Sequence, residues 1–363
     1  MTEEVEGIVP EYLTLLHGVL DSPDIPLNVS RSYLQSDAQV KKISNHIAKK
    51  VADRLDELFR NERDLFESKW DSLKVFVQYG MLSDEKFYDR AVKFDLLTDV
   101  AGKHFTLDEY RTLTESEQTD KDGSLIWLYA SDRDAQYAAI ARAEAKGYSI
   151  LLMDGPLDVH AVSQLEQKLE KTRFVRVDSD TIDKLIAKSE VKAVELSENE
   201  QSALRTIFSA RLPKEEKRNY SVSLEALGAD GDAVQVTQGE FMRRMQEMAR
   251  LQPRMNFYGD LPEGYNVILN YEHPLLQRLL QQEKSEVEPK LAELRTALAE
   301  EQAKIAAEEK ALEGQETKTS AELDTLRAKK SELEGQINSQ LNAFGENTLL
   351  VGQLIDLALL SHG

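Results

Sequence analysis

The chain has 363 residues with 65 acidic and 45 basic side chains, which gives a formal net charge of −20. Roughly two or three domains are expected at this length. A content of 41% hydrophobic and 30% charged residues is typical of globular proteins. The negative charge opposes binding to phosphate backbones and anionic lipids, so the sequence predicts no nucleic-acid partner and no membrane partner.

Cysteine is absent, which excludes disulfides, thiolate metal sites and cysteine nucleophiles, and makes the cytoplasm the expected compartment. The acidic start, Met1–Glu6, differs from the basic start of a signal peptide, and no apolar run reaches the roughly 18 residues that span a bilayer. The histidines show no metal-ligand spacing, so no metal site is expected; they are His17, His46, His104, His160, His273 and His362.

The first part of the chain is predicted to be mainly helical. A short helix over residues 11–20 precedes a loop in which Pro23 and Pro26 prevent a regular helix. Apolar residues then recur at spacings of four and three over residues 43–58, which is the pattern of a long amphipathic helix. Further helix is expected to about residue 97.

From Gly123 the period of the hydrophobic pattern changes, and short apolar runs alternate with helical stretches. The strands are expected at 125–129, 150–153 and 174–177, and the helices at 132–146 and 159–171. This order predicts a small parallel β-α-β-α-β sheet. No glycine-rich phosphate loop follows the first strand, so the glycines near residues 147 and 155 are interpreted as turns.

A polar, acidic stretch over residues 178–198 marks the expected domain boundary. Ser197 and Glu200 form a capping box that opens a helix, and the elements that follow predict an α+β domain. They are a helix to about 208, strands at 220–224, 233–236 and 265–269, and helices over 238–251 and from 273.

Residues 281–342 are rich in Ala, Glu, Lys, Leu and Gln, and their apolar residues follow a heptad rhythm on both sides of a turn at 314–320. This pattern predicts an antiparallel coiled-coil hairpin. Polar residues interrupt the predicted seam and favour a marginal coil; they are Glu301, Glu308, Lys330 and Gln340. The last segment, 349–360, is apolar nearly all round, so it must be buried in its own core or against a partner.

Several short segments, running in order along nearly the whole chain, carry a resemblance to a known family. They are Val9–Leu13, Gly18–Ser22, Pro26–Arg31, Tyr33–Gln35, Phe174–Val177, Met255–Gly259, His273–Leu275 and Gln353–Leu359. Together they resemble the 90-kilodalton heat-shock chaperones of the stress response, and the bacterial members most closely. Leu-Asn-Val-Ser-Arg in a proline-bounded loop is the most specific of these signals.

The resemblance implies a multidomain fold that combines α+β and α/β parts. Residues 8–185 correspond to the later part of the chaperone middle domain, with a helical segment at 8–97 and the parallel sheet at 123–177. Residues 186–196 are then a linker. Residues 197–363 correspond to the C-terminal dimerisation-type domain, with the hairpin at 281–342 as an insertion. The family's N-terminal ATP-binding domain, the first sheet of its middle domain and its last helix have no counterpart in the chain.

In the family, the arginine of the proline-bounded loop contacts the γ-phosphate of ATP, and this role carries over to Arg31. Asn28 and Gln35 match residues that support the loop. A guanidinium is always charged and can stabilise charge on a transferring phosphoryl group. Without the resemblance, the sequence favours the interpretation of Arg31 as a surface charge at a helix start. The chain is therefore expected to hold no cofactor and to be inactive alone, with ATP and magnesium bound in the full-length protein.

Client binding is the second implied activity. Phe241, Met245 and Met248 share one helical face with Met242 beside them, and flexible thioethers suit promiscuous binding surfaces, although the same pattern also fits a core. A second client contact in the family falls at His160, where an aromatic residue is common, so this match is weak.

The resemblance also implies a homodimer built by the last helix, through Leu350, Leu354 and Leu357, and weakened here because the following helix has no counterpart. The competing interpretation is a coiled-coil scaffold or adaptor, in which the hairpin over 281–342 binds the partner and no ATP-linked activity exists.

Overall fold

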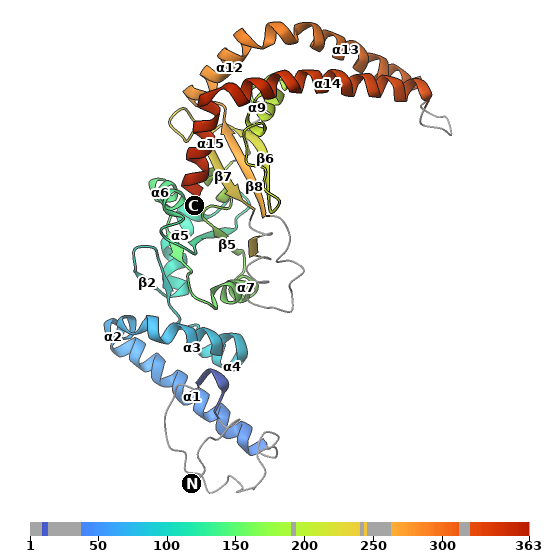
Figure 1. The fold of residues 1–363 in the computed structure, drawn as a ribbon. Helices are drawn as coiled ribbons and strands as arrows, with labels where there is room; N and C mark the ends of the chain where they lie inside the picture. The colour runs from blue at the N-terminus through green and yellow to red at the C-terminus, as the bar shows by residue number, and fades with distance from the viewer. Residues whose placement is uncertain are drawn as a thin grey trace. The chain divides into compact units, whose positions relative to one another are not determined.

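The computed structural model describes residues 9–13, 38–189, 194–239, 243–244, 263–311 and 320–362. The chain divides into two compact units (Figure 1). Unit 1 comprises Met1–Val177 and Ile182–Ser189, and unit 2 comprises Asp178–Thr181 and Glu190–Gly363. The division falls within the polar stretch in which the sequence predicts a boundary.

Unit 1 begins with a helical lobe, defined here as residues 9–13 and 38–96. Its elements are η1 (Glu11–Leu13), α1 (Ala38–Asn61), α2 (Arg63–Ser68), α3 (Trp70–Ser83) and α4 (Glu85–Ala91). The long helix predicted from the apolar spacing is α1. The helix predicted over 11–20 is described only at its start, where the chain makes a 3-10 turn. Phe66, Trp70 and Phe94 are fully buried at the centre of this lobe.

The rest of unit 1 is a sheet lobe, defined here as residues 97–177. Strands β3 (Leu125–Ala130), β4 (Ile150–Leu152) and β5 (Thr172–Arg176) form a parallel sheet in the order β4-β3-β5, which confirms the predicted small parallel sheet. Every residue of β3 is buried. Alternate side chains point to opposite faces of a strand, so Ile126 and Leu128 pack with α6 (Tyr137–Ala145), whereas Trp127 packs with α5 (Leu107–Gln118) and α7 (Asp158–Lys168).

Two details of the sheet lobe differ from the expectation. The helix predicted from residue 132 begins only at Tyr137, because Asp132 accepts the amides of Asp134 and Ala135 and Gln136 accepts those of Ser131 and Asp132. These side-chain bonds hold a turn in place of the first helical turn. The sequence interpretation also left out α5 and the short antiparallel pair β1 (Leu97–Thr98) and β2 (His104–Phe105). A capping box of Thr106 and Glu109 opens α5, and this signal is visible in the sequence.

Unit 2 holds a mixed three-stranded sheet in the order β6-β8-β7, with α9 (Glu198–Ser209) and α12 (Pro274–Glu286). Strand β8 (Glu263–Asn270) pairs in parallel with β6 (Arg218–Glu225) and antiparallel with β7 (Val234–Gln238). The predicted capping box at Ser197 and Glu200 opens α9 as expected. The helix predicted over 238–251 lies almost wholly outside the described residues.

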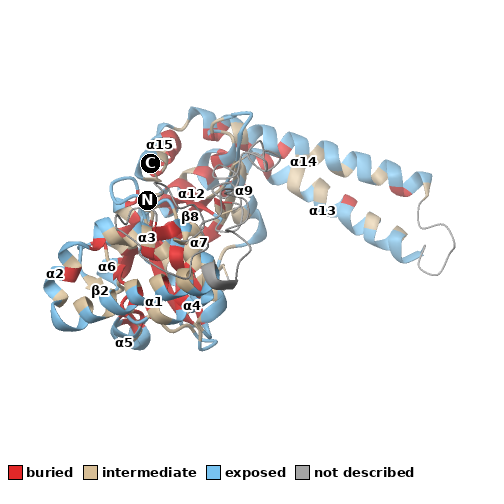
Figure 2. Ribbon diagram, turned by 90° about the horizontal axis from the view of Figure 1, so that it is seen from below, coloured by how far each residue is buried: buried red, intermediate tan, exposed pale blue. Residues whose placement is uncertain are grey.

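Helices α13 (Glu288–Ala311) and α14 (Ala321–Asn347) lie side by side as a helical hairpin (Figure 1). The first arm starts later than the predicted residue 281, because α12 ends at Glu286 and Val287 is buried in the unit 2 core at the bend. Most of the hairpin is exposed (Figure 2). The predicted turn at 314–320 falls mostly outside the described residues.

The chain closes with α15 (Leu349–His362), which packs against β7 and α14. None of the described helices is by itself long and apolar enough to cross a bilayer. Helices α14 and α15 reach that length and composition only when taken together, and the chain bends by 73° between them.

Candidate functional site

The predicted nucleotide-contacting residues Asn28, Arg31 and Gln35 lie outside the described residues, so the structure describes only the chain on either side of them. That chain is η1 on one side and α1 on the other. Both are seated on one apolar core: Tyr12 and Leu13 of η1, and Ala48 and Ala52 of α1, are buried in the helical lobe.

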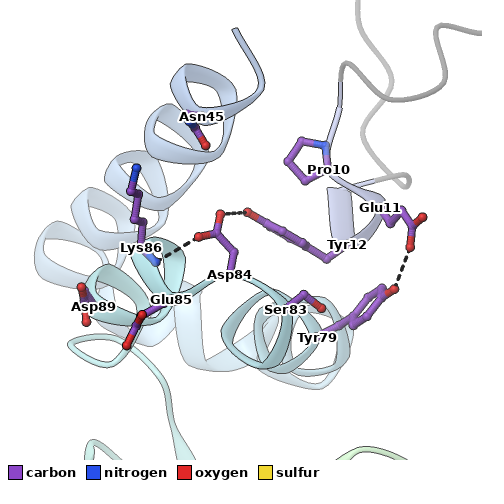
Figure 3. Close-up of a pocket in the computed structure, with 10 residues that line it drawn as sticks. All are labelled: Pro10, Glu11, Tyr12, Asn45, Tyr79, Ser83, Asp84, Glu85, Lys86 and Asp89. Carbon is purple, nitrogen blue, oxygen red and sulfur yellow. Dashed lines mark hydrogen bonds between the residues drawn. The ribbon is translucent and has the colours of Figure 1, made fainter. Parts of the chain in front are cut away.

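Tyr12 ties η1 to the junction of α3 and α4 (Figure 3). Its hydroxyl donates to Asp84 Oδ2 at 3.1 Å, while Oδ1 of the same carboxylate accepts the amides of Lys86 and Phe87 and caps α4. Burial and the Asp84 carboxylate raise the pKa of Tyr12 well above its ordinary value. The phenol therefore stays protonated and remains a donor across the physiological range.

Gly80 makes the close seat for Tyr12 possible. A Cβ atom at this position of α3 would lie 2.7 Å from the Phe87 ring and 2.9 Å from the Tyr12 ring. The Tyr12 and Phe87 rings pack with their centroids 5.0 Å apart. A larger residue at position 80 would push both rings out of the core.

An open cavity of about 630 Å³ lies beside this contact (Figure 3). Two residues that line it are bonded to each other, because Tyr79 donates to Glu11 Oε2 at 3.1 Å. The lining is Pro10, Glu11, Tyr12, Asn45, Tyr79, Ser83, Asp84, Glu85, Lys86 and Asp89. Four carboxylates against one lysine make a poor site for a nucleotide phosphate. Within the described ranges no group of three or more His, Asp or Glu side chains could hold a metal ion.

The predicted client-binding residues Phe241, Met242, Met245 and Met248 also lie outside the described residues. His160, the weak second match, lies half-buried on α7. Of the two predicted client contacts, the structure therefore describes only the second, at His160.

The three predicted interface leucines of α15 differ in exposure. Leu354 is 7% exposed and belongs to the core of unit 2, Leu350 is half-buried, and Leu357 is 64% exposed. Leu349 and Leu360 at the two ends of the helix are 70% and 81% exposed. The apolar surface of α15 that is free to meet a partner is therefore carried by Leu349, Leu357 and Leu360.

Comparison with known proteins shows the protein family to which the chain belongs. The family model described as "Hsp90 protein" matches residues 1–334. The chain belongs to the Hsp90 family, which confirms the resemblance found in the sequence.

Several bacterial proteins that are similar to the chain are named "Chaperone protein HtpG". The chain is 59% identical over 370 residues to that of Porphyromonas gingivalis and 51% identical over 367 residues to that of Bacteroides fragilis. Each match covers 100% of the chain and 54% of the relative, so the chain spans about half the length of these curated relatives. The protein of Mycolicibacterium paratuberculosis is 32% identical over 159 residues, 43% of the chain and 24% of the relative.

Proposed function

We propose that the chain is the middle and C-terminal part of an ATP-driven molecular chaperone that binds unfolded or partly folded client proteins. The observation that carries the proposal is the match of the whole chain to relatives named as chaperones. Unit 1 then corresponds to the later middle domain and unit 2 to the C-terminal domain, which dimerises and carries the client-contacting residues 241–248.

In this proposal Arg31 contacts the γ-phosphate of ATP held by an N-terminal nucleotide-binding domain. The seating of η1 and α1 on one core supports the role, because it brings the two ends of the stretch that carries Arg31 to the same lobe. A guanidinium in contact with the γ-phosphate stabilises the charge that develops during phosphoryl transfer. Its loss lowers turnover when phosphoryl transfer is the rate-limiting step.

The test is Arg31→Ala in the full-length protein, with ATP turnover and ATP affinity measured separately. Turnover should fall by about ten-fold or more with affinity nearly unchanged, because the contact forms chiefly in the transition state. Arg54→Ala is the matched control, because Arg54 is an exposed arginine of α1 that pairs with Glu57 within its own helix. A large loss of affinity at unchanged turnover contradicts the assigned role.

The chain alone is expected to show no measurable ATP binding in calorimetry, because in this proposal the nucleotide pocket belongs to another domain. Binding of unfolded protein should persist, and it should weaken when Met245 and Met248 are changed to Glu together. Saturable ATP binding by the chain alone would contradict the assignment of the nucleotide site to another domain.

The scaffold interpretation remains the second candidate because the long exposed hairpin is present. Deleting residues 299–332 and joining the ends with a short glycine-serine linker leaves the core-facing Leu291 and Ile337 in place. Chaperone activity should largely survive this deletion. If suppression of client aggregation is lost while the deletion variant stays folded, the hairpin carries the binding and the scaffold interpretation is favoured.

A further inference from the structure

The helical lobe and the sheet lobe of unit 1 each have an apolar core of their own, and a row of polar contacts joins them. Gln164 of α7 donates to the Met81 carbonyl at 2.8 Å, and Lys168 of α7 pairs with Glu85 at 3.0 Å. On the α5 side, Arg63 of α2 forms a two-pronged pair with Glu109. Val92 of the helical lobe also packs against both apolar cores. The hydrogen bond and ion pairs are directional, so they restrict the orientation of one lobe on the other.

The buried centre of this junction is a single carboxylate, Asp158, at the start of α7. Lys74 Nζ of α3 donates to its Oδ2 at 2.9 Å, and Gln78 Nε2 of α3 donates to its Oδ1 at 2.7 Å. The Gly155 amide of the sheet lobe also donates to Oδ2 at 2.8 Å. Asp158 is only 3% exposed, so one carboxylate accepts bonds from both lobes away from water.

A second buried carboxyl group interacts electrostatically with Lys74 and Asp158. Asp95 is 5% exposed and lies in the short connection between α4 and β1, through which the chain passes from one lobe to the other. Lys74 of α3 and Asp158 of α7 act electrostatically on Asp95, and Asp95 acts in the same way on Tyr88 of α4. Burial, opposed by Lys74 and reinforced by Asp158, raises the pKa of Asp95 to about 7.

The charges of the cluster do not balance when both carboxyl groups are ionised. One ammonium group then serves two buried carboxylates, and the cluster carries a net negative charge in a medium that screens it poorly. When Asp95 is neutral, Lys74 and Asp158 form a balanced pair. Tyr88 does not change this account, because burial raises its pKa and keeps it neutral near pH 7.

We propose that Asp95 is a proton switch that controls the junction between the two lobes: its neutral form locks Lys74 and Gln78 onto Asp158, and its ionised form loosens α3 from α7. Separation of the helices admits water to the cluster, and hydration of the extra charge offsets the lost contacts. The inference concerns the conformation of unit 1 and does not depend on ATP or on clients.

The absence of cysteine permits a direct test by pulsed electron paramagnetic resonance. Spin labels at Ser72→Cys of α3 and Ala141→Cys of α6, both exposed, report the distance between the lobes. The distribution should be narrow at about pH 5 and broad or shifted at about pH 9, with a midpoint near pH 7, because the ratio of ionised to neutral Asp95 changes ten-fold for each pH unit.

Two variants and one control test whether Asp95 causes the change of the distance distribution with pH. Asp95→Asn keeps the shape of the side chain without the charge and should hold the narrow distribution at every pH. Lys74→Gln removes the cation that favours ionised Asp95, so any remaining transition should move to higher pH. Asp89→Asn, at an exposed carboxylate of α4, should behave as the parent protein. Circular dichroism checks that each variant is folded.

The inference is overturned by a distribution that does not change with pH in the parent protein. A pH response that persists in folded Asp95→Asn overturns it as well, because another group would then be responsible. If Asp95→Asn does not fold, Lys74→Gln decides: a midpoint that stays in place or moves to lower pH contradicts the switch.

Discussion

Glu301 of α13 and Lys329 of α14 form an ion pair at 2.8 Å across the helical hairpin. Lys304 reaches the same Glu301 oxygen at 2.8 Å from within α13, and the Glu301 side chain is only 3% exposed. The sequence interpretation treats Glu301 as an interruption of the apolar seam. The structure shows instead a buried carboxylate that pairs with one lysine from each arm of the hairpin.

Replacing Glu301 tests whether that pair stabilises the hairpin. Glu301→Leu should leave the melting temperature unchanged or raise it by a few degrees, because a well-packed apolar residue often replaces a buried ion pair without loss. Lys329→Ala should lower it, since Glu301 then loses its partner in the other arm. Circular dichroism during thermal unfolding checks both. A clear loss of stability in Glu301→Leu would show that the pair is a net stabiliser.

The bond from Tyr12 to Asp84 should contribute measurably to unit 1. Tyr12→Phe should lower the free energy of unfolding by about 1 kcal/mol through loss of one hydrogen bond. Asp84→Ala should cost about 1–3 kcal/mol because it also removes the cap of α4. Both tryptophans, Trp70 and Trp127, lie in unit 1, so fluorescence during urea unfolding reports on this unit.

Tyr88→Phe is the matched control for that experiment, because Tyr88 is also a buried tyrosine of the helical lobe but does not bond to Asp84. It should change the free energy of unfolding by less than Tyr12→Phe. An equal loss in both variants would show that the Tyr12 hydroxyl has no special part in holding η1.

Assembly through α15 is best tested at an exposed position. Leu357→Glu should leave the melting temperature nearly unchanged and shift any monomer–dimer equilibrium toward monomer, because it places a charge on the free apolar face. Leu354→Glu should instead destabilise unit 2, because it buries an unpaired charge in the core. Sedimentation over a range of protein concentrations checks the first result. A dimer that survives Leu357→Glu must use another surface.

Glu200 makes the stability of unit 2 depend on pH in the acid range. Lys284, at 2.6 Å, and then the hydroxyl and amide of Ser197 lower the pKa of Glu200 to about 2 from its ordinary value near 4.5. The folded pKa is the lower one, so the stabilisation is present above about pH 4.5 and is lost as the pH falls toward 2. Glu200→Gln should therefore flatten the loss of ellipticity between these values. An unchanged acid profile would show that other carboxylates dominate.

Much of the fold could be predicted from the sequence because it depends on local rules. The parallel strands follow from near-continuous apolar runs, and Gly147 ends α6 with a φ of 78° that glycine adopts readily. The capping box of Ser197 and Glu200 marks the start of α9 to the residue. Helix α5 was missed because its apolar face is sparse, although the capping box at Thr106 marks its start.

The candidate site was predicted less completely. The motif that contains Arg31 predicts a contact with the γ-phosphate of ATP. The sequence gives no sign that Tyr12 bonds to Asp84, 72 positions away, or that Gly80 makes room for the Tyr12 ring. Such contacts depend on which faces of α3 and α4 meet, and helical periodicity alone does not select one partner over another.

By itself, the sequence determined the order and type of most elements, the heptad rhythm of the hairpin and the family, because each of these resides in short stretches of neighbouring residues. Only the tertiary structure decided that Asp158 is buried against Lys74, 84 positions away, that Leu354 faces the core while Leu357 faces outward, and that Glu301 is paired. Burial and the electrostatics that follow from it are properties of residues brought together from distant positions, and the amino-acid type at one position does not specify its surroundings.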